Sequence, residues 1–220
     1  MLDEFIKYTN TEEFYQRANF HLLSFKGQIN NFKPVEFNFA IETLDLYGKI
    51  SNMEYWQIIA HCTIDFHGMH FEQYLPYIKL QLITENHPLL WEYHTPKLEC
   101  TLKNLPKDLS GFTGDLFIKY EKHTGNWLPF HDYFKALGNQ YQLNEKRISI
   151  PKPLEAIVKE VCEKYNVDFI VKKETEGHKK GYLHRPNAKV LLFGNEDVSP
   201  NNYNLGQNYI IADYFVASKK

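Results

Sequence analysis

Asp65, His67 and His70 bring a carboxylate and two imidazoles into one short segment, WQIIAHCTIDFHGMH, at residues 56–70. Side chains of these types ligate zinc, iron or manganese. If the segment is a β-strand, the alternation of side chains places Asp65 and His67 on one face, ~7 Å apart along the strand. His70 can join them if the chain turns back at the intervening glycine. The segment therefore suggests a metal site, and with it a metal-dependent enzyme, as one hypothesis.

A complete metal site needs a further ligand from elsewhere in the chain. His61 shares the expected strand face, but it would lie ~20 Å from His67 along a straight strand, too far to share one ion. Three distant histidines are candidates instead: His87, His94 and His131. The competing interpretation is structural. The polar residues then form the solvent-facing side of an antiparallel strand whose other side, Ile58 to Phe66, is buried.

The three cysteines, Cys62, Cys100 and Cys162, are expected to be buried thiols. Their number is odd and no CxxC spacing occurs, so neither a disulfide framework nor a zinc ribbon is indicated. Cys62 and His61 do not form a nucleophile–base pair in a strand, because neighbouring side chains point to opposite faces. The first residues lack the apolar core of a signal peptide, and no stretch approaches ~18 apolar residues. These features predict a cytoplasmic protein with no membrane association.

A basic segment at residues 172–189 offers a second kind of chemistry. It holds six Lys and Arg against two Glu, a local net charge of +4, and Lys179, Lys180 and Arg185 are the candidates for contact with phosphate or nucleic acid. A Walker A spacing is absent, and Tyr182 is the only aromatic residue there that could stack on a base. A solvated hairpin tip explains the same residues, so nucleic acid is not the favoured partner.

A third candidate is the aromatic segment NWLPFHDYF at residues 126–134. Trp127 and His131 would line a ligand-binding wall, with the ring as the apolar part and the imidazole as the polar part. The alternative is a packed connector, because aromatic clusters that follow an amphipathic helix usually belong to the core.

The composition is that of an ordinary globular protein rich in aromatic residues. Of 220 residues, 43% are hydrophobic, 24% are charged and 15% are aromatic, and the net charge is −2. This charge gives no general attraction to nucleic acid or to an anionic membrane. The common sequence signatures of hydrolases, zincins, dinucleotide-binding proteins and nucleoside triphosphatases are missing, which lowers the expectation of an enzyme without removing it.

Periodicity predicts an α+β fold with a predominantly antiparallel β-sheet and two or three packed amphipathic helices. Short strands separated by polar turns favour antiparallel pairing, because a parallel return needs a long crossover. The expected helices are 9–19, Asp108–His123 and Lys152–Tyr165. The expected strands are Val35–Leu46, Tyr55–His67, Tyr77–Thr84, Lys97–Lys103, Val167–Lys172, Lys189–Phe193 and Asn208–Val216.

We expect residues 1–220 to form a single compact unit, with a possible subdivision into a sheet-rich part at 1–134 and a helix with three strands at 150–220. The favoured function is a non-enzymatic binding or interaction protein whose partner is a protein or a small-molecule ligand. The loops 174–188 and 194–206 are the expected recognition surfaces. The sequence specifies no cofactor and no oligomeric state.

Overall fold

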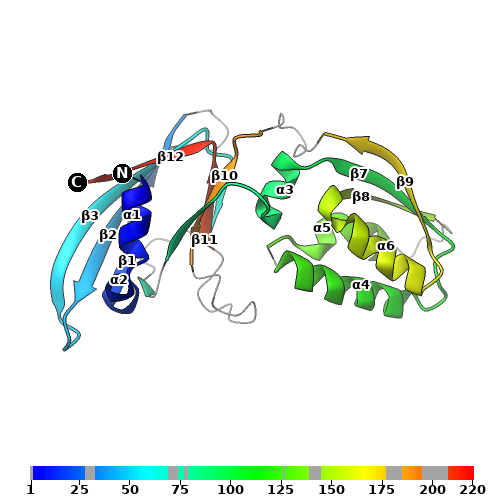
Figure 1. The fold of residues 1–220 in the computed structure, drawn as a ribbon, viewed down its shortest axis with the longest axis horizontal. Coiled ribbons are helices and arrows are strands. Elements are labelled where there is room, and N and C mark those ends of the chain that lie inside the picture. The colour runs from blue at the N-terminus through cyan, green and yellow to red at the C-terminus, as the bar shows by residue number, and fades with distance from the viewer. Residues whose placement is uncertain are drawn as a thin grey trace. The chain divides into compact units, whose positions relative to one another are not determined.

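The computed structural model describes residues 2–27, 33–68, 74–76, 79–125, 127–138, 145–176, 185–194 and 208–220. The chain forms two compact units (Figure 1). Unit 1 combines Met1–Glu85 with Asn187–Lys220, and unit 2 is Asn86–Pro186. Every strand pairing among the described residues is antiparallel, so the expected α+β fold with mostly antiparallel sheet is confirmed.

Unit 1 contains two sheets and two N-terminal helices. One sheet has the strand order β12-β3-β2-β1-β5 and the other has the order β4-β11-β10-β6. The elements are α1 (Leu2–Thr9), α2 (Glu12–Arg17), β1 (Ala18–Lys26), β2 (Val35–Leu44), β3 (Ile50–His61), β4 (Asp65–His67), β5 (Tyr74–Pro76), β6 (Leu80–Ile83), β10 (Lys189–Phe193), β11 (Asn208–Ala212) and β12 (Tyr214–Lys219).

The helix expected at 9–19 is instead two short helices. Thr11 caps the second helix, α2, because its side chain accepts a hydrogen bond from the Phe14 backbone amide at 3.3 Å. The first helix, α1, ends at Thr9, and its Phe5 is fully buried. The chain turns from helix to strand at Ala18, nearer the N-terminus than the periodicity indicated.

The strand expected at Tyr55–His67 is interrupted, and this corrects the shared-face prediction. Cys62 has a φ of 53°, a left-handed conformation that ends β3 and turns the chain toward β4. The two strands belong to different sheets. The strand expected at Asn208–Val216 is likewise divided at Asp213 into β11 and β12. β11 belongs to the same sheet as β4, and β12 belongs to the same sheet as β3. Both breaks let a continuous chain pass from one sheet to the other, as at the corners of packed sheets.

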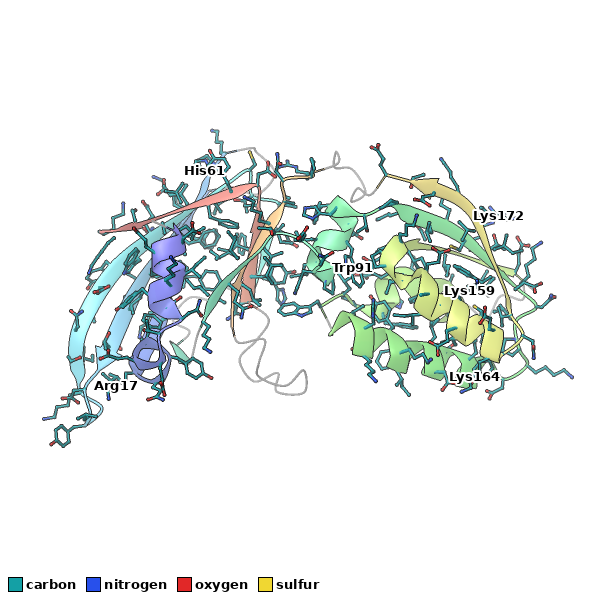
Figure 2. The ribbon with its side chains drawn as sticks, viewed as in Figure 1. Arg17, His61, Trp91, Lys159, Lys164 and Lys172 are labelled. Carbon is teal, nitrogen blue, oxygen red and sulfur yellow. The ribbon has the colours of Figure 1, made fainter. Side chains whose placement is uncertain are left out.

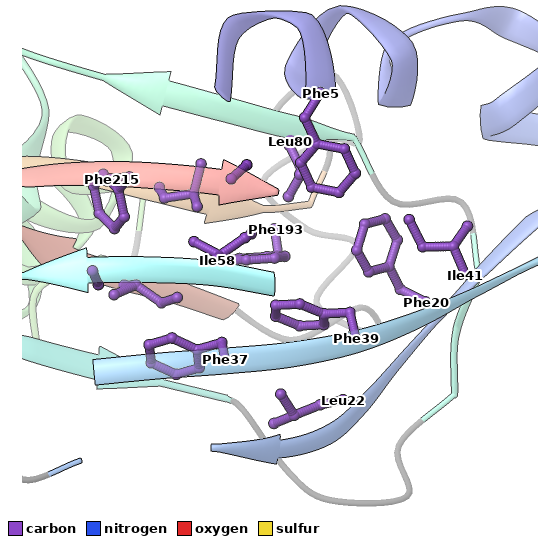
Figure 3. Close-up of a cluster of buried hydrophobic side chains, with 14 of the residues drawn as sticks. Phe5, Phe20, Leu22, Phe37, Phe39, Ile41, Ile58, Leu80, Phe193 and Phe215 are labelled. Carbon is purple, nitrogen blue, oxygen red and sulfur yellow. The ribbon is translucent and has the colours of Figure 1, made fainter. Parts of the chain in front are cut away.

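Aromatic rings fill the core of unit 1 (Figure 3). Phe20 lies at its centre and makes edge-to-face contacts with Phe14, Phe39 and Phe193 at centroid distances of 5.6–6.3 Å. Phe5 of α1 stacks on Trp56 of β3 at 4.1 Å. The inner faces of both sheets contribute, so much of the aromatic surplus in the sequence is core material rather than a ligand platform.

Unit 2 is a three-stranded sheet packed with helices. The sheet has the order β8-β7-β9, with β7 in the centre. The elements are α3 (Pro88–His94), β7 (Lys97–Lys103), α4 (Leu109–Thr124), α5 (Phe130–Gly138), β8 (Glu145–Pro151), the short 3₁₀-helix η1 (Lys152–Leu154), α6 (Glu155–Lys164) and β9 (Asp168–Thr175).

Local signals in the sequence set the boundaries of α4. The Asp108 side chain accepts a hydrogen bond from the Gly111 amide at 2.9 Å, and Gly125 closes the helix in the left-handed region with a φ of 58°. The buried stripe of this helix is Phe112, Leu116 and Tyr120, at three- and four-residue spacing. The predicted helix is therefore confirmed with its caps.

The possible subdivision into 1–134 and 150–220 does not match the two units. A boundary there would separate β7 from β8 and β9, although β7 pairs with both along its whole length. β9 joins β7 in unit 2, whereas β10, β11 and β12 belong to unit 1. In addition, the expected connector at 126–134 contains the start of α5, and the polar stretch after it contains β8.

Candidate interaction surface

The turn that joins β2 to β3 is held rigidly by one carboxylate. Asp45 Oδ1 accepts hydrogen bonds from the amides of Tyr47 at 2.8 Å and Lys49 at 2.9 Å. The Asp45 amide donates to the Lys49 carbonyl at 2.8 Å, and Gly48 has a φ of 75°. This arrangement is that of a three-residue hairpin loop with a left-handed glycine, and the paired strands on both sides hold the two ends of the loop in place.

The turn presents apolar side chains to solvent. Leu46 is 80% exposed, Tyr47 is 88% exposed, and Ile50, the first residue of β3, is 55% exposed. In Figure 1 this end of β2 and β3 extends beyond α1 and α2. Single exposed apolar residues are normal on protein surfaces, but three within five positions on an ordered turn form a patch, and such patches mark interaction sites.

A second group of exposed apolar residues lies on the five-stranded sheet that this turn belongs to. Leu23, Met53 and Tyr55 are exposed there and line a shallow hollow of about 540 Å³ together with Ala40. Its polar members are His21 and Glu42, whose Nε2 and Oε2 atoms lie 3.2 Å apart. We name the turn residues Leu46, Tyr47 and Ile50, together with Leu23, Met53 and Tyr55, the hairpin surface.

Two of the three predicted metal residues, Asp65 and His67, lie in a short strand, β4. The Asp65 carboxylate accepts a hydrogen bond from the Phe66 amide at 2.9 Å, and the exposed His67 stacks on Tyr209 with ring centroids 5.7 Å apart. Burial and, secondarily, the Asp65 charge raise the pKa of Tyr209 to about 12. His70 lies outside the described residues. Asp65 and His67 therefore remain predicted metal ligands.

The other candidate ligands are dispersed. His61 lies in β3 and stacks on Tyr214 of β12 with centroids 4.1 Å apart. His87, by contrast, is buried at the start of α3, where it serves as the N-cap. Within the part of the chain that the structure describes, no three His, Cys, Asp or Glu residues are grouped to hold a metal ion. The metal hypothesis stays a prediction, and elemental analysis of protein purified without a histidine tag tests it.

The ligand-binding wall of Trp127 and His131 stays a prediction, and the structure describes the surroundings of each residue. Trp127 is half-buried and makes an edge-to-face contact with the His87 ring at a centroid distance of 5.0 Å. His131 is on α5 and is exposed. The neighbouring ring of Phe134 is buried against Tyr120 instead. Of this aromatic segment, Leu128, Tyr133 and Phe134 are buried and contribute to the core of unit 2.

Lys179 and Lys180 lie outside the described residues, as do most of the loops 174–188 and 194–206 that were expected to carry recognition. Arg185 is described and is half-buried shortly before β10. Contact with nucleic acid or phosphate through these residues stays a prediction. Its test is the loss of salt-sensitive binding when Lys179 and Lys180 are both changed to Glu.

Two of the three cysteines are buried as expected. Burial raises the pKa of Cys100 to about 11 and that of Cys162 to about 12, so neither thiol is a ready nucleophile. Cys62 is different, because it lies partly exposed in the turn after β3 rather than on a buried strand face. The alternating pattern fails there because the strand ends.

The hairpin surface was not among the sites suggested by the sequence. A local signal did exist, since Leu46 and Tyr47 directly precede Gly48, and apolar residues at a turn cannot all be buried by the strands beside it. No helix among the described residues has the length and apolar character needed to cross a bilayer. No protein-family model matches the chain, and no curated protein matches its sequence.

Proposed function

We propose that this protein is a non-enzymatic binding protein that engages a protein partner through the hairpin surface of unit 1. The observation that carries the proposal is the fixed exposure of Leu46 and Tyr47 on a turn ordered by Asp45. The rigid turn lowers the entropy lost on association, because these backbone positions are already ordered. Burying each side chain in a partner contributes about 2 kcal/mol.

The chemistry of the hairpin surface favours an apolar groove on a protein rather than a lipid surface. Membrane-binding segments combine apolar residues with several basic ones. Lys49 is the only cation in the turn, and Asp45 balances it. Tyrosine is also enriched among residues that dominate protein interfaces, because its ring is large, has few rotatable bonds and keeps a polar tip. We place the protein in the cytoplasm in this proposal, because its three cysteines are odd in number and do not suggest the disulfide framework of a secreted protein.

The proposal is tested by placing a photo-crosslinking amino acid at Tyr47 and, in a matched protein, at Lys122, an exposed residue of α4 in unit 2. We expect a protein adduct from position 47 alone, and we expect Leu46→Ser in the same protein to abolish it. The partner, identified by mass spectrometry and then purified, should bind Leu46→Ser at least about tenfold more weakly by calorimetry, equivalent to about 1.4 kcal/mol.

Two results would reject the proposal. Equal adducts from both positions would show non-specific contact. Binding of anionic lipid vesicles that is lost in Leu46→Ser, with no protein adduct, would identify a membrane surface as the partner instead. The melting temperature of Leu46→Ser should match that of the unaltered protein, because the side chain is exposed.

A further inference from the structure

A cavity of about 690 Å³, lined by both polar and apolar residues, lies within unit 2. Its lining comes from α5 and from the strands β7 and β8, with Lys172 of β9. The volume falls in the range of small-molecule sites, which are about 300–1,000 Å³. None of the residues that line the cavity belongs to the hairpin surface, so the cavity is independent of the function proposed above.

Strand register places polar side chains in rows along the wall of this cavity. Arg147 of β8 is opposite Thr101 of β7, and Ser149 is opposite Glu99. These positions alternate along β7 with the buried Leu98, Cys100 and Leu102. Cys100 and its β8 partner Ile148 also line the cavity and are among its buried members. Arg147, Ser149 and Glu99 are all exposed and therefore available to a ligand.

Lys172 is positioned by an irregularity in the sheet. The pairing of β7 with β9 shifts between Glu99 and Cys100, so that Lys173 is opposite Glu99 and Val171 is opposite Cys100. Lys172 is the extra residue between them, as in a β-bulge, which re-aims a side chain. Figure 2 shows Lys172 on β9, and its side chain contributes to the cavity lining.

The cations of the cavity differ in whether they are already neutralised. Lys103 pairs with Glu145, with 3.3 Å between Nζ and Oε2. Among the residues that the structure describes, the side chains of the other three cations of the lining, Arg147, Lys172 and Lys135, make no hydrogen bond or ion pair. Arg147 and Lys172 belong to the sheet wall, and Lys135 belongs to α5. An arginine fork and a lysine ammonium together form a receptor for one oxyanion. The carboxylates of Glu99 and Asp132 line the same cavity and are available as hydrogen-bond acceptors.

We propose that this cavity binds a small organic anion through Arg147 and Lys172. The anionic group, a phosphate or a carboxylate, accepts hydrogen bonds from the Arg147 guanidinium, and the Lys172 ammonium supplies the second positive charge. The Ser149 hydroxyl donates a hydrogen bond to the same group. Glu99 and Asp132 accept hydrogen bonds from hydroxyl groups on the body of the ligand, so a hydroxylated anion binds more tightly than a bare one.

The test is a titration of the whole protein at constant ionic strength, followed by amide NMR and calorimetry. The probes are inorganic phosphate, glycerol 3-phosphate and succinate, which distinguish phosphate from carboxylate and a bare anion from a hydroxylated one. We expect saturable shifts at residues of β7 and β8 that line the cavity, with glycerol 3-phosphate binding more tightly than inorganic phosphate because its hydroxyl groups donate to the carboxylates. Tighter binding of succinate than of glycerol 3-phosphate would overturn the assignment of Glu99 and Asp132 as acceptors of ligand hydroxyl groups. Arg147→Ala should weaken binding about tenfold or more, and Arg147→Lys should weaken it less.

Lys122→Ala is the matched control, since Lys122 is an exposed cation outside the cavity. It should leave the affinity unchanged, and Lys172→Ala should weaken binding independently of Arg147. Absence of saturable shifts with all three probes at about 10 mM, well above a millimolar dissociation constant, would overturn the proposal. Equal weakening by Arg147→Ala and Lys122→Ala would also overturn it, because the attraction would then be a general effect of charge.

Discussion

Ile83 in β6 and Val190 in β10 are paired neighbours in one antiparallel sheet, although the whole of unit 2 lies between them in the sequence. The chain therefore leaves unit 1 and returns to it at one point, as in a hairpin whose turn has been replaced by an inserted unit. The main hydrophobic cluster of unit 1 is built only from residues outside Asn86–Pro186. Each unit thus has its own set of internal contacts.

This arrangement predicts that unit 2 can be excised. Replacing Asn86–Pro186 with a short Asn-Gly turn should leave unit 1 folded, because that turn suits antiparallel strands and the aromatic core is complete without the insert. The shortened protein should melt in one cooperative transition and keep its near-ultraviolet circular dichroism. A broad transition with loss of that signal would show that unit 1 depends on unit 2.

Several elements could be predicted from the sequence because their signals are local. β7 and β10 have the bounds expected from alternation, Lys97–Lys103 and Lys189–Phe193. The helix α4 was predictable because an aspartate cap, an apolar stripe and a terminal glycine agree with one another. Where the periodicity and the capping residues indicate the same boundaries, tertiary contacts do not change the local structure that the sequence favours.

Other features depend on contacts between distant residues and leave no local signal. The break at Cys62 arises because β3 and β4 belong to different sheets, while the sequence on both sides alternates without interruption. The pairing of Ile83 with Val190 bridges an entire inserted unit. β8 was missed because its sequence, EKRISIP, is short and charged, and its inward-facing Ile148 and Ile150 are buried only through its pairing with β7.

The core of unit 1 predicts a large difference between two apolar positions. Phe20→Ala should lower the free energy of unfolding by about 3–5 kcal/mol, because the ring is buried among Phe14, Phe39 and Phe193. Leu46→Ala should change it by less than about 0.5 kcal/mol, because that side chain is exposed. Urea unfolding measures both. A loss above about 1 kcal/mol for Leu46→Ala, roughly twice the usual effect of a surface substitution, would mean that Leu46 stabilises the fold instead of being available to a partner.

The candidate sites were less predictable than the fold, because binding surfaces are assembled from separate segments. Arg147 and Lys172 both line one cavity because β8 and β9 pair with opposite edges of β7, although the two residues are distant in sequence. The strand that carries Lys172 was predicted, but β8, which carries Arg147, was not. The hairpin surface has a local signal in Leu46 and Tyr47, but only the structure adds Leu23 from the neighbouring strand. The sequence shows which residue types could take part in a site, but the strand register determines which of these residues lie close together.

Asp115 links α4 to the end of α6 and predicts an acid-sensitive contribution to stability. Its carboxylate accepts hydrogen bonds from Lys164 and, at 2.9 Å, from the Tyr165 hydroxyl. The hydrogen bond from Lys164, followed by that from Tyr165, holds the pKa of Asp115 below its ordinary value. Because the folded pKa is the lower one, the contribution is full above the ordinary pKa and is lost as the pH falls through the folded pKa.

Asp115→Asn should therefore be less stable than the unaltered protein at neutral pH, and the difference should shrink below about pH 4, where free aspartate titrates. Urea unfolding at a series of pH values measures this difference. Glu99→Gln is the matched control, since Glu99 is an exposed acid in the same unit whose carboxylate makes no hydrogen bond or ion pair among the described residues. A stability difference for Asp115→Asn that is independent of pH would show that packing, and not the charge, is responsible.

His87 predicts a second pH dependence, centred in unit 2. Its Nδ1 accepts a hydrogen bond from the Leu89 amide at 3.3 Å, which requires that nitrogen to be unprotonated. Burial lowers the pKa of His87 from 6.5 to about 4. The unfolded chain therefore binds a proton more readily than the folded one, so the stability from the neutral ring is full above pH 6.5 and is lost progressively as the pH falls to about 4.

The size of this effect follows from the shift, since each pKa unit corresponds to about 1.4 kcal/mol, giving a loss of roughly 3 kcal/mol across the interval. His87→Asn should remove this dependence, because asparagine also caps helices and does not titrate in this range. His131→Asn is the control, since His131 is an exposed histidine in the same unit. Urea unfolding between neutral pH and about pH 4 should give a flatter stability profile for His87→Asn alone; the same slope in both variants would assign the acid sensitivity to other groups.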